Sequence, residues 1–537
     1  MARNLITTWG DWAATRAAFR WNIPEHFNIA ERCCDSWAAH NPARVALIHV
    51  AQTGQAQEWT YGQLKQASDR LANSFRARGV VKGDRIAVFL GQGPEVLITH
   101  FAAYKLGAVV LPLFTLFGPD ALAYRLSDSG AKVVVTDGAN LEKVQSLRAD
   151  LPDLAQVYCT DGGASPVRDF RAEIDAASDQ LQPENTLAED PAVMIYTSGT
   201  TGPPKGVLHA QRFLLGHLTS METHHEQFPQ PGDVGWTPAD WAWIGGLMDM
   251  AMPCLFYGVP LVSHRMRKFD PDFAYGLIER HKVRNLFLPP TALKLMRQAR
   301  VPQGVDVRSI GSGGESLGAD LLDWAQTTLG APVNEIYGQT ECNLVLASCA
   351  GLMQVRPGSM GQAVPGHDVA VIDSAGRECA PGEMGEIAVR RPDPVMFLRY
   401  WNLPEKTAEK FIGDWMRTGD LAVRDEDGYF TFASRDDDVI TSSGYRIGPS
   451  EIENCLTGHP DVVMAAVVGV PDPVRTEAVK AFVVLREGAQ LAELEGALVQ
   501  RVRDKISPHV APRMVEQIAE MPMTATGKIM RRELRAH

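Results

Sequence analysis

The sequence has 537 residues, more than one ordinary domain holds, so two to four compact units are expected. Hydrophobic residues make up 45% of the chain and charged residues 22%, a composition that is typical of a folded globular protein and excludes a disordered one. A formal net charge of −12 argues against nucleic acid or an anionic membrane surface as the main partner, and an anionic substrate would need a local concentration of positive charge.

Short apolar runs alternate with helical patterns through most of the chain, as in a protein whose parallel strands are joined by helices. Runs rich in Val, Ile and Leu predict buried strands, and longer segments with apolar residues at helical spacing predict helices. The predicted strands are residues 85–90, 108–113, 132–136, 285–288 and 305–310, and the predicted helices are residues 95–106, 291–297 and 319–329. This order indicates an α/β fold of layered subdomains.

The C-terminal part has a different pattern. Residues 462–470 and 480–485 predict strands and residues 491–505 predict a helix, which together indicate a small α+β domain. The segment 434–438, SRDDD, is a charged stretch that few buried contacts should cross. We therefore predict a large N-terminal domain over residues 1–435 and a small C-terminal domain over residues 438–537.

Cysteine usage and the N-terminal segment indicate a cytoplasmic protein. The chain has eight cysteines and no C-x-x-C spacing, so buried thiols in a reducing compartment are favoured over a structural zinc site. The N-terminal segment mixes Asp and Arg with its apolar residues, which differs from a signal peptide. No uninterrupted apolar stretch approaches the ~20 residues that a membrane-spanning helix needs. We expect a cytoplasmic protein with no integral membrane segment and no nucleic-acid partner, and the sequence leaves the oligomeric state open.

The strongest local pattern is the segment 196–207, YTSGTTGPPKGV, which follows an apolar run at 191–195. Its glycines let the backbone turn N–H groups toward an anion, its hydroxyls add donors, and Lys205 adds a positive charge. This combination suits a polyphosphate. The segment is not a Walker A loop, because Pro204 precedes the lysine and Gly206 follows it. Taken alone, the loop could also be a flexible linker.

Four further segments follow this loop in order: EIYGQTE at 335–341, RTGDL at 417–421, SRDDDVITSSGYRIGPSEIE at 434–453, and MTATGK at 523–528. Together with the loop they resemble the motifs of the adenylate-forming, or AMP-binding, superfamily of acyl-CoA synthetases, peptide-synthetase adenylation domains and luciferases. The segment SSGYRIGPSEIE is most similar to short- and medium-chain acyl-CoA synthetases. The resemblance covers essentially the whole chain. It implies an ATP-dependent ligase that forms an acyl-AMP from a carboxylic acid and then passes the acyl group to coenzyme A.

The resemblance also implies an ATP site with Mg²⁺. Thr340 would contact the α-phosphate and Glu341 would help to hold Mg²⁺, while Asp420 and Arg435 would bind the ribose. Tyr337 would stack on adenine and Glu335 would lie near its amino group. The loop residues around the β- and γ-phosphates would be Thr197, Ser198, Gly199, Thr200, Thr201, Gly202 and Lys205, and the remaining residues of the nucleotide site would be Gly313, Gly314, Glu315, Gly338 and Gln339.

In the small domain the resemblance implies two alternating sites. Lys528 would bridge the acyl carboxylate and the α-phosphate during adenylation, although residue type alone would make it a surface lysine of a basic tail. The domain would then rotate about a hinge at Asp437, and this makes it a mobile domain. The residues that would meet coenzyme A in the second pose are Ser443, Gly444, Tyr445, Arg446 and Arg475.

The acyl pocket is expected to follow the segment 236–250, WTPADWAWIGGLMDM, which is rich in tryptophan. The resemblance implies that Trp243 borders the acyl tunnel, and Gly245 and Gly246 would leave room for a chain. Trp241 has no assigned role, and aromatic residues at this density are more often part of a core. His209 follows the phosphate loop and is as well explained by a structural role as by a catalytic one.

The preferred substrate is a short- to medium-chain acid, with a branched or aromatic acid also open. Two other functions compete with a coenzyme A ligase. The first is a ligase that delivers its acyl-adenylate to a separate carrier protein, and the second is a nucleotide-binding sensor that has lost catalysis. The joint presence of Lys205, Glu341, Asp420, Arg435 and Lys528 argues against the sensor.

Overall fold

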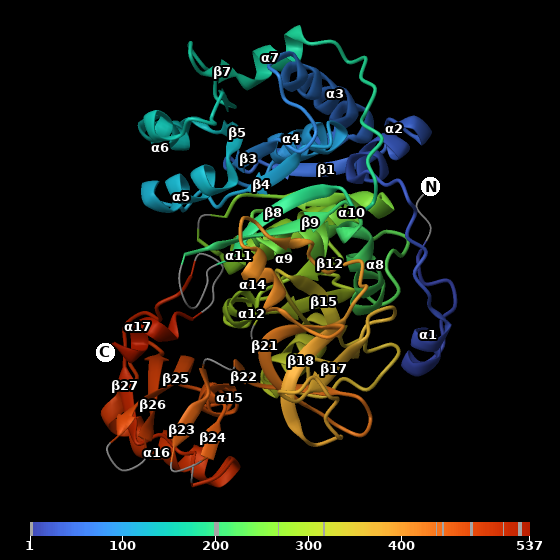
Figure 1. Cartoon of the computed structure of the whole chain (residues 1–537). Coiled ribbons are helices and arrows are strands. Elements are labelled where there is room, and N and C mark those ends of the chain that lie inside the picture. The colour runs from blue at the N-terminus through green and yellow to red at the C-terminus, as the bar shows by residue number, and fades with distance from the viewer. Residues whose placement is uncertain are drawn as a thin grey trace.

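The structure is a computed structural model of the chain (Figure 1), in which a large N-terminal domain is followed by a smaller C-terminal domain. It describes residues 4–197, 203–266, 268–314, 317–435, 438–442, 445–472, 476–508, 510–524 and 529–536. Within these ranges, no helix combines the length and the apolar character that crossing a bilayer requires.

Among the described residues, the first sheet of the large domain has eight strands. Their bounds are β3 (Arg85–Phe89), β4 (Val109–Pro112), β5 (Ala131–Thr136), β6 (Gln156–Cys159), β7 (Arg168–Asp169), β8 (Pro191–Thr197), β9 (Lys205–Ala210) and β19 (Arg399–Tyr400). The spatial order is β19-β9-β8-β4-β3-β5-β6-β7, and the strands from β8 to β7 are parallel. The strands expected near residues 85, 108 and 132 are therefore confirmed, because their apolar runs are buried on both faces of a parallel sheet.

The second sheet of the large domain has nine strands within the described ranges, in the order β16-β15-β14-β13-β12-β10-β11-β1-β2. It is parallel from β14 to β1 and antiparallel at both ends. The bounds are β1 (Val45–Val50), β2 (Ala56–Thr60), β10 (Gly235–Trp236), β11 (Leu261–Ser263), β12 (Asn285–Phe287), β13 (Ser309–Gly313), β14 (Val333–Gln339), β15 (Cys342–Ala347) and β16 (Gln362–Ala363).

The strand expected over residues 305–310 lies further along the chain, because β13 begins at Ser309 and ends at Gly313. Glycine weakens the sequence signal for a strand, yet Gly311 pairs with both β12 and β14, and residues 312–313 continue the pairing with β14. The ladder thus carries the chain in extended form up to Gly313, so this glycine ends a strand rather than opening a loop.

A third sheet closes the large domain, and among the described residues it has five strands. They are β17 (Val369–Ile372), β18 (Met384–Arg390), β20 (Phe411–Ile412), β21 (Trp415–Arg424) and β22 (Phe430–Arg435). All of its pairings are antiparallel.

The helices of the large domain cover the sheets, and two of them are buried between layers. Almost every residue of α4 and every residue of α8 is buried; α4 is largely apolar, whereas α8 also buries polar side chains such as Glu222. The bounds are α1 (Trp12–Ala18), α2 (Ser36–His40), α3 (Tyr61–Ala77), α4 (Pro94–Lys105), α5 (Pro119–Ser129), α6 (Gly138–Leu147), α7 (Phe170–Ala176), α8 (Phe213–His224), α9 (Ile244–Gly246), α10 (Met252–Tyr257), α11 (Pro271–His281), α12 (Pro290–Met296), α13 (Ala319–Trp324) and α14 (Pro404–Ala408). Within the described ranges of the large domain, π-helical turns at Glu31–Asp35, Leu247–Ala251 and Ala325–Leu329 and a 3₁₀ turn at Arg148–Asp150 continue or connect these helices.

The small domain has its own sheet and its own core. Its described strands are β23 (Ile440–Ser442), β24 (Tyr445–Ile447), β25 (Val462–Asp472), β26 (Thr476–Leu485) and β27 (Met514–Gln517), and its helices are α15 (Pro449–Thr457), α16 (Leu491–Lys505) and α17 (Arg531–Arg535). No hydrophobic cluster of the described residues combines side chains from before residue 436 with side chains from after residue 437. Figure 1 shows this domain in orange to red, beside β21 and β22 of the large domain.

Asp438 belongs to the charged stretch that was expected to be solvated, but its carboxylate is mostly covered. It forms ion pairs with Arg531 and Arg535 of α17, at 3.3 and 2.9 Å. Arg531 also forms an ion pair with Glu453 of α15, at 2.8 Å. These pairs tie the start of the small domain to its last helix.

The N-terminal segment is held by a buried carboxylate of α8. Glu222 is fully buried and accepts hydrogen bonds from the backbone N–H groups of Leu5 and Ile6, at 2.6 and 2.9 Å, and from the hydroxyl of Tyr257. Burial raises the pKa of Glu222 to about 7. Because a raised carboxyl pKa means that the folded state holds a proton that the unfolded state has lost, stability falls as the pH rises from the ordinary carboxyl pKa through about 7.

We predict that Glu222→Gln removes this pH dependence. Relative to the variant, the wild-type protein should lose about 3 kcal/mol of unfolding free energy between pH 4.5 and pH 7 or above. Denaturant unfolding of both proteins at several pH values measures the difference, and Glu226→Gln, about one turn further along the chain and just beyond the end of α8, serves as the control. Parallel pH profiles for the wild type and Glu222→Gln would contradict the prediction.

Candidate active site

The residues of the expected nucleotide site come together around the carboxylate of Asp420. This carboxylate is 7% exposed, and its Oδ2 accepts hydrogen bonds from the Tyr337 hydroxyl and from Gln339 Nε2, both at 2.6 Å. Arg435 is its cross-strand partner on β22, with Nε at 3.8 Å from Oδ1. Strands β14, β21 and β22 thus converge at one carboxylate.

Gln339 makes a second contact with the same strand, since its Nε2 also donates to the carbonyl of Thr418 at 2.8 Å. The part of β21 just before Asp420 is held by Glu386, which accepts from the backbone N–H of Gly419 at 2.7 Å and forms an ion pair with Arg417. The position of the Asp420 carboxylate is therefore determined from both sides.

Glu341 lies just beyond the end of β14 and is mostly buried. It accepts a hydrogen bond from the hydroxyl of Tyr400, and the ammonium of Lys205 lies 4.4 Å from the centroid of the Tyr400 ring. Tyr400 belongs to β19, which pairs with β9 opposite Val207. Tyr400 thus connects Lys205 of the β8–β9 hairpin with the carboxylate of Glu341.

Positive charge gathers at this place although the whole chain is acidic. Burial lowers the pKa of Lys205, the positive charges of Lys410, Lys406 and Arg435 lower it further, and Glu341 opposes them. The local concentration of positive charge that an anionic substrate requires is therefore present beside the loop that joins β8 and β9.

The site offers one carboxylate to a metal ion. Among the described residues no group of three or more His, Cys, Asp or Glu side chains could hold a metal by itself. Magnesium in nucleotide sites is commonly held by one or two carboxylates together with the phosphates of the substrate. Glu341, next to the phosphate-loop hairpin, fits this arrangement.

Glu335 occupies the buried part of β14, opposite Ser312 of β13. Burial raises its pKa to about 8, so the carboxyl is mostly protonated at neutral pH. Its Oε1 is buried and makes no hydrogen bond with the part of the chain that the structure describes. A neutral carboxyl can both donate and accept, which suits the edge of a nucleobase.

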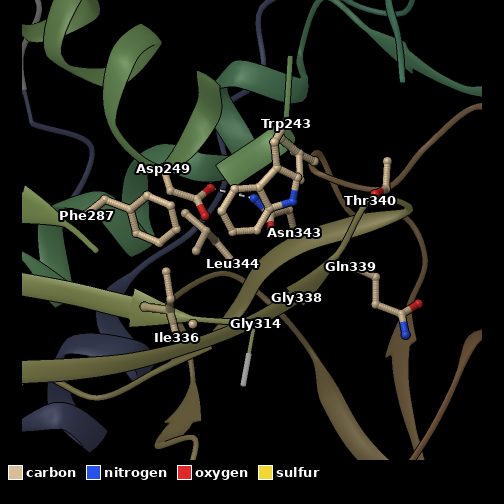
Figure 2. Close-up of a pocket in the computed structure, with 12 residues that line it drawn as sticks. Trp243, Asp249, Phe287, Gly314, Ile336, Gly338, Gln339, Thr340, Asn343 and Leu344 are labelled. Atoms are coloured by element: carbon tan, nitrogen blue, oxygen red, sulfur yellow. Dashed lines mark hydrogen bonds between the residues drawn. The ribbon is translucent and has the colours of Figure 1, made fainter. Parts of the chain in front are cut away.

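A pocket that is partly open to solvent lies next to this cluster. Figure 2 shows Gln339 and Thr340 on one side of it and Phe287 and Ile336 on the other. Its lining residues are Trp243, Ile244, Asp249, Phe287, Gly313, Gly314, Ile336, Gly338, Gln339, Thr340, Asn343 and Leu344. Trp243, which was expected to border the acyl tunnel, is thus in the lining, together with Gly313 and Thr340 of the expected nucleotide site.

The two glycines after Trp243 act differently from what the sequence suggested. A Cβ on Gly245 would come within 2.8 Å of the Trp243 ring, and a Cβ on Gly246 would come within 2.4 Å of the carbonyl oxygen of Asp240. Neither glycine lines the pocket. The space beside them is filled by the protein itself, so they permit close packing of Trp243 and the preceding turn and leave no room for a chain.

Two aromatic residues of uncertain role belong to the core. Trp241 is buried in the main hydrophobic cluster. His209 is fully buried and stacks on Phe213, with ring centroids 3.8 Å apart, and burial lowers its pKa well below the usual value.

The other expected residues are placed only in part. Thr197 ends β8 opposite Lys205, and Gly314 follows β13 with a positive φ of 98°. Tyr445 and Arg446 lie on β24, opposite Ser442 and Thr441. The residues that lie outside the described part are Ser198, Gly199, Thr200, Thr201, Gly202, Glu315, Asp437, Ser443, Gly444, Arg475 and Lys528.

Three residues of the site were missed from sequence. Tyr400 reaches Glu341 through a strand pairing between distant segments, for which the sequence has no signal. Asn343 lines the pocket from β15. Asp249 also lines it, and here a signal existed, because Asp249 is the only charged residue between positions 241 and 263.

Comparison with known proteins agrees with this geometry. A family model described as AMP-binding enzyme matches residues 34–401, and one described as AMP-binding enzyme C-terminal domain matches residues 451–528. The chain is 34% identical to the acetyl-coenzyme A synthetase of Bacillus subtilis (strain 168), over 98% of this chain and 93% of the relative. It is 35% identical to the mitochondrial acyl-coenzyme A synthetase ACSM5 of Homo sapiens, over 96% of this chain and 91% of the relative.

Solved structures are similar over nearly the whole chain. An acyl-CoA synthetase of Brucella canis has a TM-score of 0.74 at 37% identity, covering 99% of this chain and 98% of the other. The anthranilate CoA ligase AuaEII in complex with anthranoyl-AMP has a TM-score of 0.87 at 26% identity, covering 96% and 98%. With the nucleotide motifs converging on Asp420 and with relatives matched from end to end, the chain belongs to the family of AMP-binding enzymes.

Proposed function

We propose that this protein ligates a short- to medium-chain carboxylic acid to coenzyme A by way of an acyl-AMP. Its relatives are acyl-CoA synthetases over almost their full length, and the reaction class is that of an ATP-dependent acid–CoA ligase. The observation that carries the proposal is the convergence of Tyr337, Gln339 and Arg435 on Asp420, beside a pocket that Thr340 also lines.

In the first half-reaction the acid carboxylate attacks the α-phosphate of ATP and pyrophosphate leaves. Two anions must approach each other, so the barrier is lowered by positive charge at the leaving phosphates. Lys205 and the loop residues 197–202 would surround the β- and γ-phosphates, and Thr340 would contact the α-phosphate. Tyr337 and Glu335 would recognise adenine, and Asp420 with Arg435 would hold the ribose.

Mg²⁺ bound with ATP would neutralise part of the triphosphate charge, and Glu341 is the carboxylate that would help to hold it. The hydrogen bond from Tyr400 orients that carboxylate before the nucleotide enters. Gly313, Gly314, Glu315, Gly338 and Gln339 complete the proposed nucleotide site.

In the second half-reaction the thiol of coenzyme A attacks the acyl-AMP and releases AMP. We propose that the small domain, over residues 438–537, turns about Asp437 between the steps. In one pose it would present Lys528 to the reacting carboxylate and phosphate. In the other it would present Ser443, Gly444, Tyr445, Arg446 and Arg475 to coenzyme A. The separate core of the small domain supports such a movement.

The acyl group would occupy the pocket between Trp243, Phe287 and Ile336. Its aromatic walls suit a compact acid, and among solved relatives one is a benzoate CoA ligase from Burkholderia xenovorans LB400, at 27% identity. An aromatic acid therefore belongs to the substrate range to be tested. We also propose a cytoplasmic location, since the adjacent Cys33 and Cys34 are buried as thiols.

The first prediction concerns the reaction itself. With MgATP and a panel of acids from acetate to dodecanoate plus benzoate, we expect AMP release that requires coenzyme A and peaks at one size of acid. Release of AMP without coenzyme A would instead indicate delivery to another acceptor. ATP binding without turnover of any acid would indicate a sensor and contradict the proposal.

The second prediction is a split effect of Lys528→Ala. The variant should lose acyl-AMP formation by two or more orders of magnitude and yet convert supplied acyl-AMP to thioester at close to the wild-type rate, because the lysine acts in only one pose. Lys505→Ala, an exposed lysine of α16, is the control. An equal loss in both half-reactions would contradict the alternation of the small domain.

The third prediction tests the Asp420 cluster. Asp420→Ala removes the acceptor shared by Tyr337 and Gln339 and the proposed ribose ligand, so kcat/KM for ATP should fall by roughly 10- to 100-fold, in line with the loss of hydrogen bonds to a charged group. Asp425→Ala on the same segment changes an exposed ion pair with Arg356 and should leave kcat/KM within about twofold. Equal effects of the two substitutions would exclude a specific nucleotide role for Asp420.

A further inference from the structure

One acidic side chain lies in the wall of the pocket where the acyl group would bind. Asp249 sits in the π-helical turn Leu247–Ala251 and is 4% exposed. It is one of the lining residues, with Trp243, Ile244, Phe287 and Leu344 as apolar neighbours in the same wall. A charged residue in an apolar segment is costly to bury unless something hydrogen-bonds to it.

Asn343 of β15 supplies a hydrogen bond to one of the two carboxyl oxygens of Asp249. The Asn343 amide nitrogen donates to Asp249 Oδ1 at 2.6 Å, the contact drawn as a dashed line in Figure 2. The same nitrogen lies 3.2 Å from His217 Nε2. His217 Nδ1 lies 2.7 Å from the carbonyl oxygen of Phe213, so Nδ1 carries the proton and Nε2 accepts.

This chain of contacts uses both N–H bonds of the Asn343 amide, one toward His217 and one toward Asp249. The burial of His217 lowers its pKa to about 3, which keeps the imidazole neutral and in the accepting form. Asp249 Oδ1 therefore already accepts from an amide whose orientation is fixed by His217, so we expect a ligand to contact the other oxygen.

The other oxygen, Oδ2, has no hydrogen bond to any residue in the described ranges. Among the described residues, Oδ2 is not one of the side-chain atoms that are both completely buried and without a hydrogen bond, and Asp249 lines the pocket. Burial raises the pKa of Asp249 well above the usual carboxyl value and so favours the protonated carboxyl, a group that can both donate and accept.

A purely hydrocarbon acyl group would cover this oxygen and leave it without a partner. Sites built to hydrogen-bond a substrate group discriminate strongly against the analogue that lacks the group, because the polar residue of the site is then buried unpaired. The apolar walls would favour an acyl group of complementary shape. Asp249 would favour one that carries a polar atom at one position.

We propose that the acid taken by this enzyme carries a hydroxyl or amino group on its acyl part, and that Asp249, positioned by Asn343, binds that group as the specificity-determining residue. The proposal rests on the proposed ligase function and narrows its substrate class. A hydroxyl would exchange hydrogen bonds with the neutral carboxyl. A neutral amine would take the proton from the Asp249 carboxyl, and the resulting ammonium and carboxylate would form an ion pair.

A role of Asp249 that is only structural makes a different forecast. If the carboxyl served only to orient Asn343 and His217, its replacement would impair all acids alike. Selectivity between matched acids separates the two roles, because a structural defect cancels in the ratio of their kcat/KM values.

The experiment measures kcat/KM for pairs of acids that share one carbon skeleton. The pairs are hexanoate with 6-hydroxyhexanoate and with 6-aminohexanoate, and benzoate with 3- and 4-hydroxybenzoate and with the corresponding aminobenzoates. The proteins are the wild type, Asp249→Leu, Asp249→Asn, and the control Ile336→Val, which removes one methylene from the same pocket without touching the polar network. Thermal unfolding of each variant checks that it is folded.

In at least one pair we expect the wild type to prefer the polar acid by about tenfold or more. Asp249→Leu should reverse the preference, and Ile336→Val should leave it unchanged. Asp249→Asn keeps the acceptor for Asn343 and can hydrogen-bond a hydroxyl, but it cannot ionise. It should therefore retain the preference if the group is a hydroxyl and lose it if the group is an amine.

Preference for the unsubstituted member in every pair, or the same ratio in the wild type and in Asp249→Leu, would overturn the proposal while leaving the ligase function intact. If no acid at all is turned over, the proposed function fails. The preference between paired acids is then measured by calorimetry as the ratio of their dissociation constants. The same results would support or overturn the role of Asp249.

Discussion

The Asp420 carboxylate is the point on which the nucleotide site depends. Tyr337 and Gln339 reach it from β14, and Arg435 lies opposite it on β22, so one buried anion connects the nine-stranded sheet with the third sheet. A buried carboxylate is stable only when hydrogen bonds and positive charge compensate it, and here the compensating groups are residues of the proposed nucleotide site. Arg435 is also the last residue of β22, so the cluster stands where the large domain ends.

Three further carboxyl groups lie in the same region, and each has different surroundings. Glu341 accepts from Tyr400 near Lys205 and stands where a metal-bound triphosphate would arrive. Burial raises the pKa of Glu335 to about 8 and raises that of Asp249 well above the usual carboxyl value. The roles proposed for these carboxyl groups differ because the surroundings of each group decide whether it keeps its proton.

Much of the fold could be predicted from sequence where the signals are local. The apolar runs of β3, β4 and β5 and the helix α16 were located closely, since burial on both faces of a strand and helical spacing leave clear patterns. The strand β13 was misplaced because two of its last three residues are glycines, whose extended form comes from pairing with the neighbouring strands. Asp438 was expected in solvent, but a helix about ninety residues later supplies its two arginine partners.

The sequence by itself determined the reaction class, because the order of five short motifs reports residues that chemistry with ATP requires at fixed places. Only the tertiary structure decided which side chains meet. Tyr400 reaches Glu341 through the pairing of β19 with β9, and Gly245 and Gly246 proved to pack against Trp243 and its turn. Asp249 became a candidate for substrate choice once β15 placed Asn343 beside it. Motifs are local in the chain and survive in the sequence, whereas pocket walls are assembled from distant segments whose contacts no local pattern encodes.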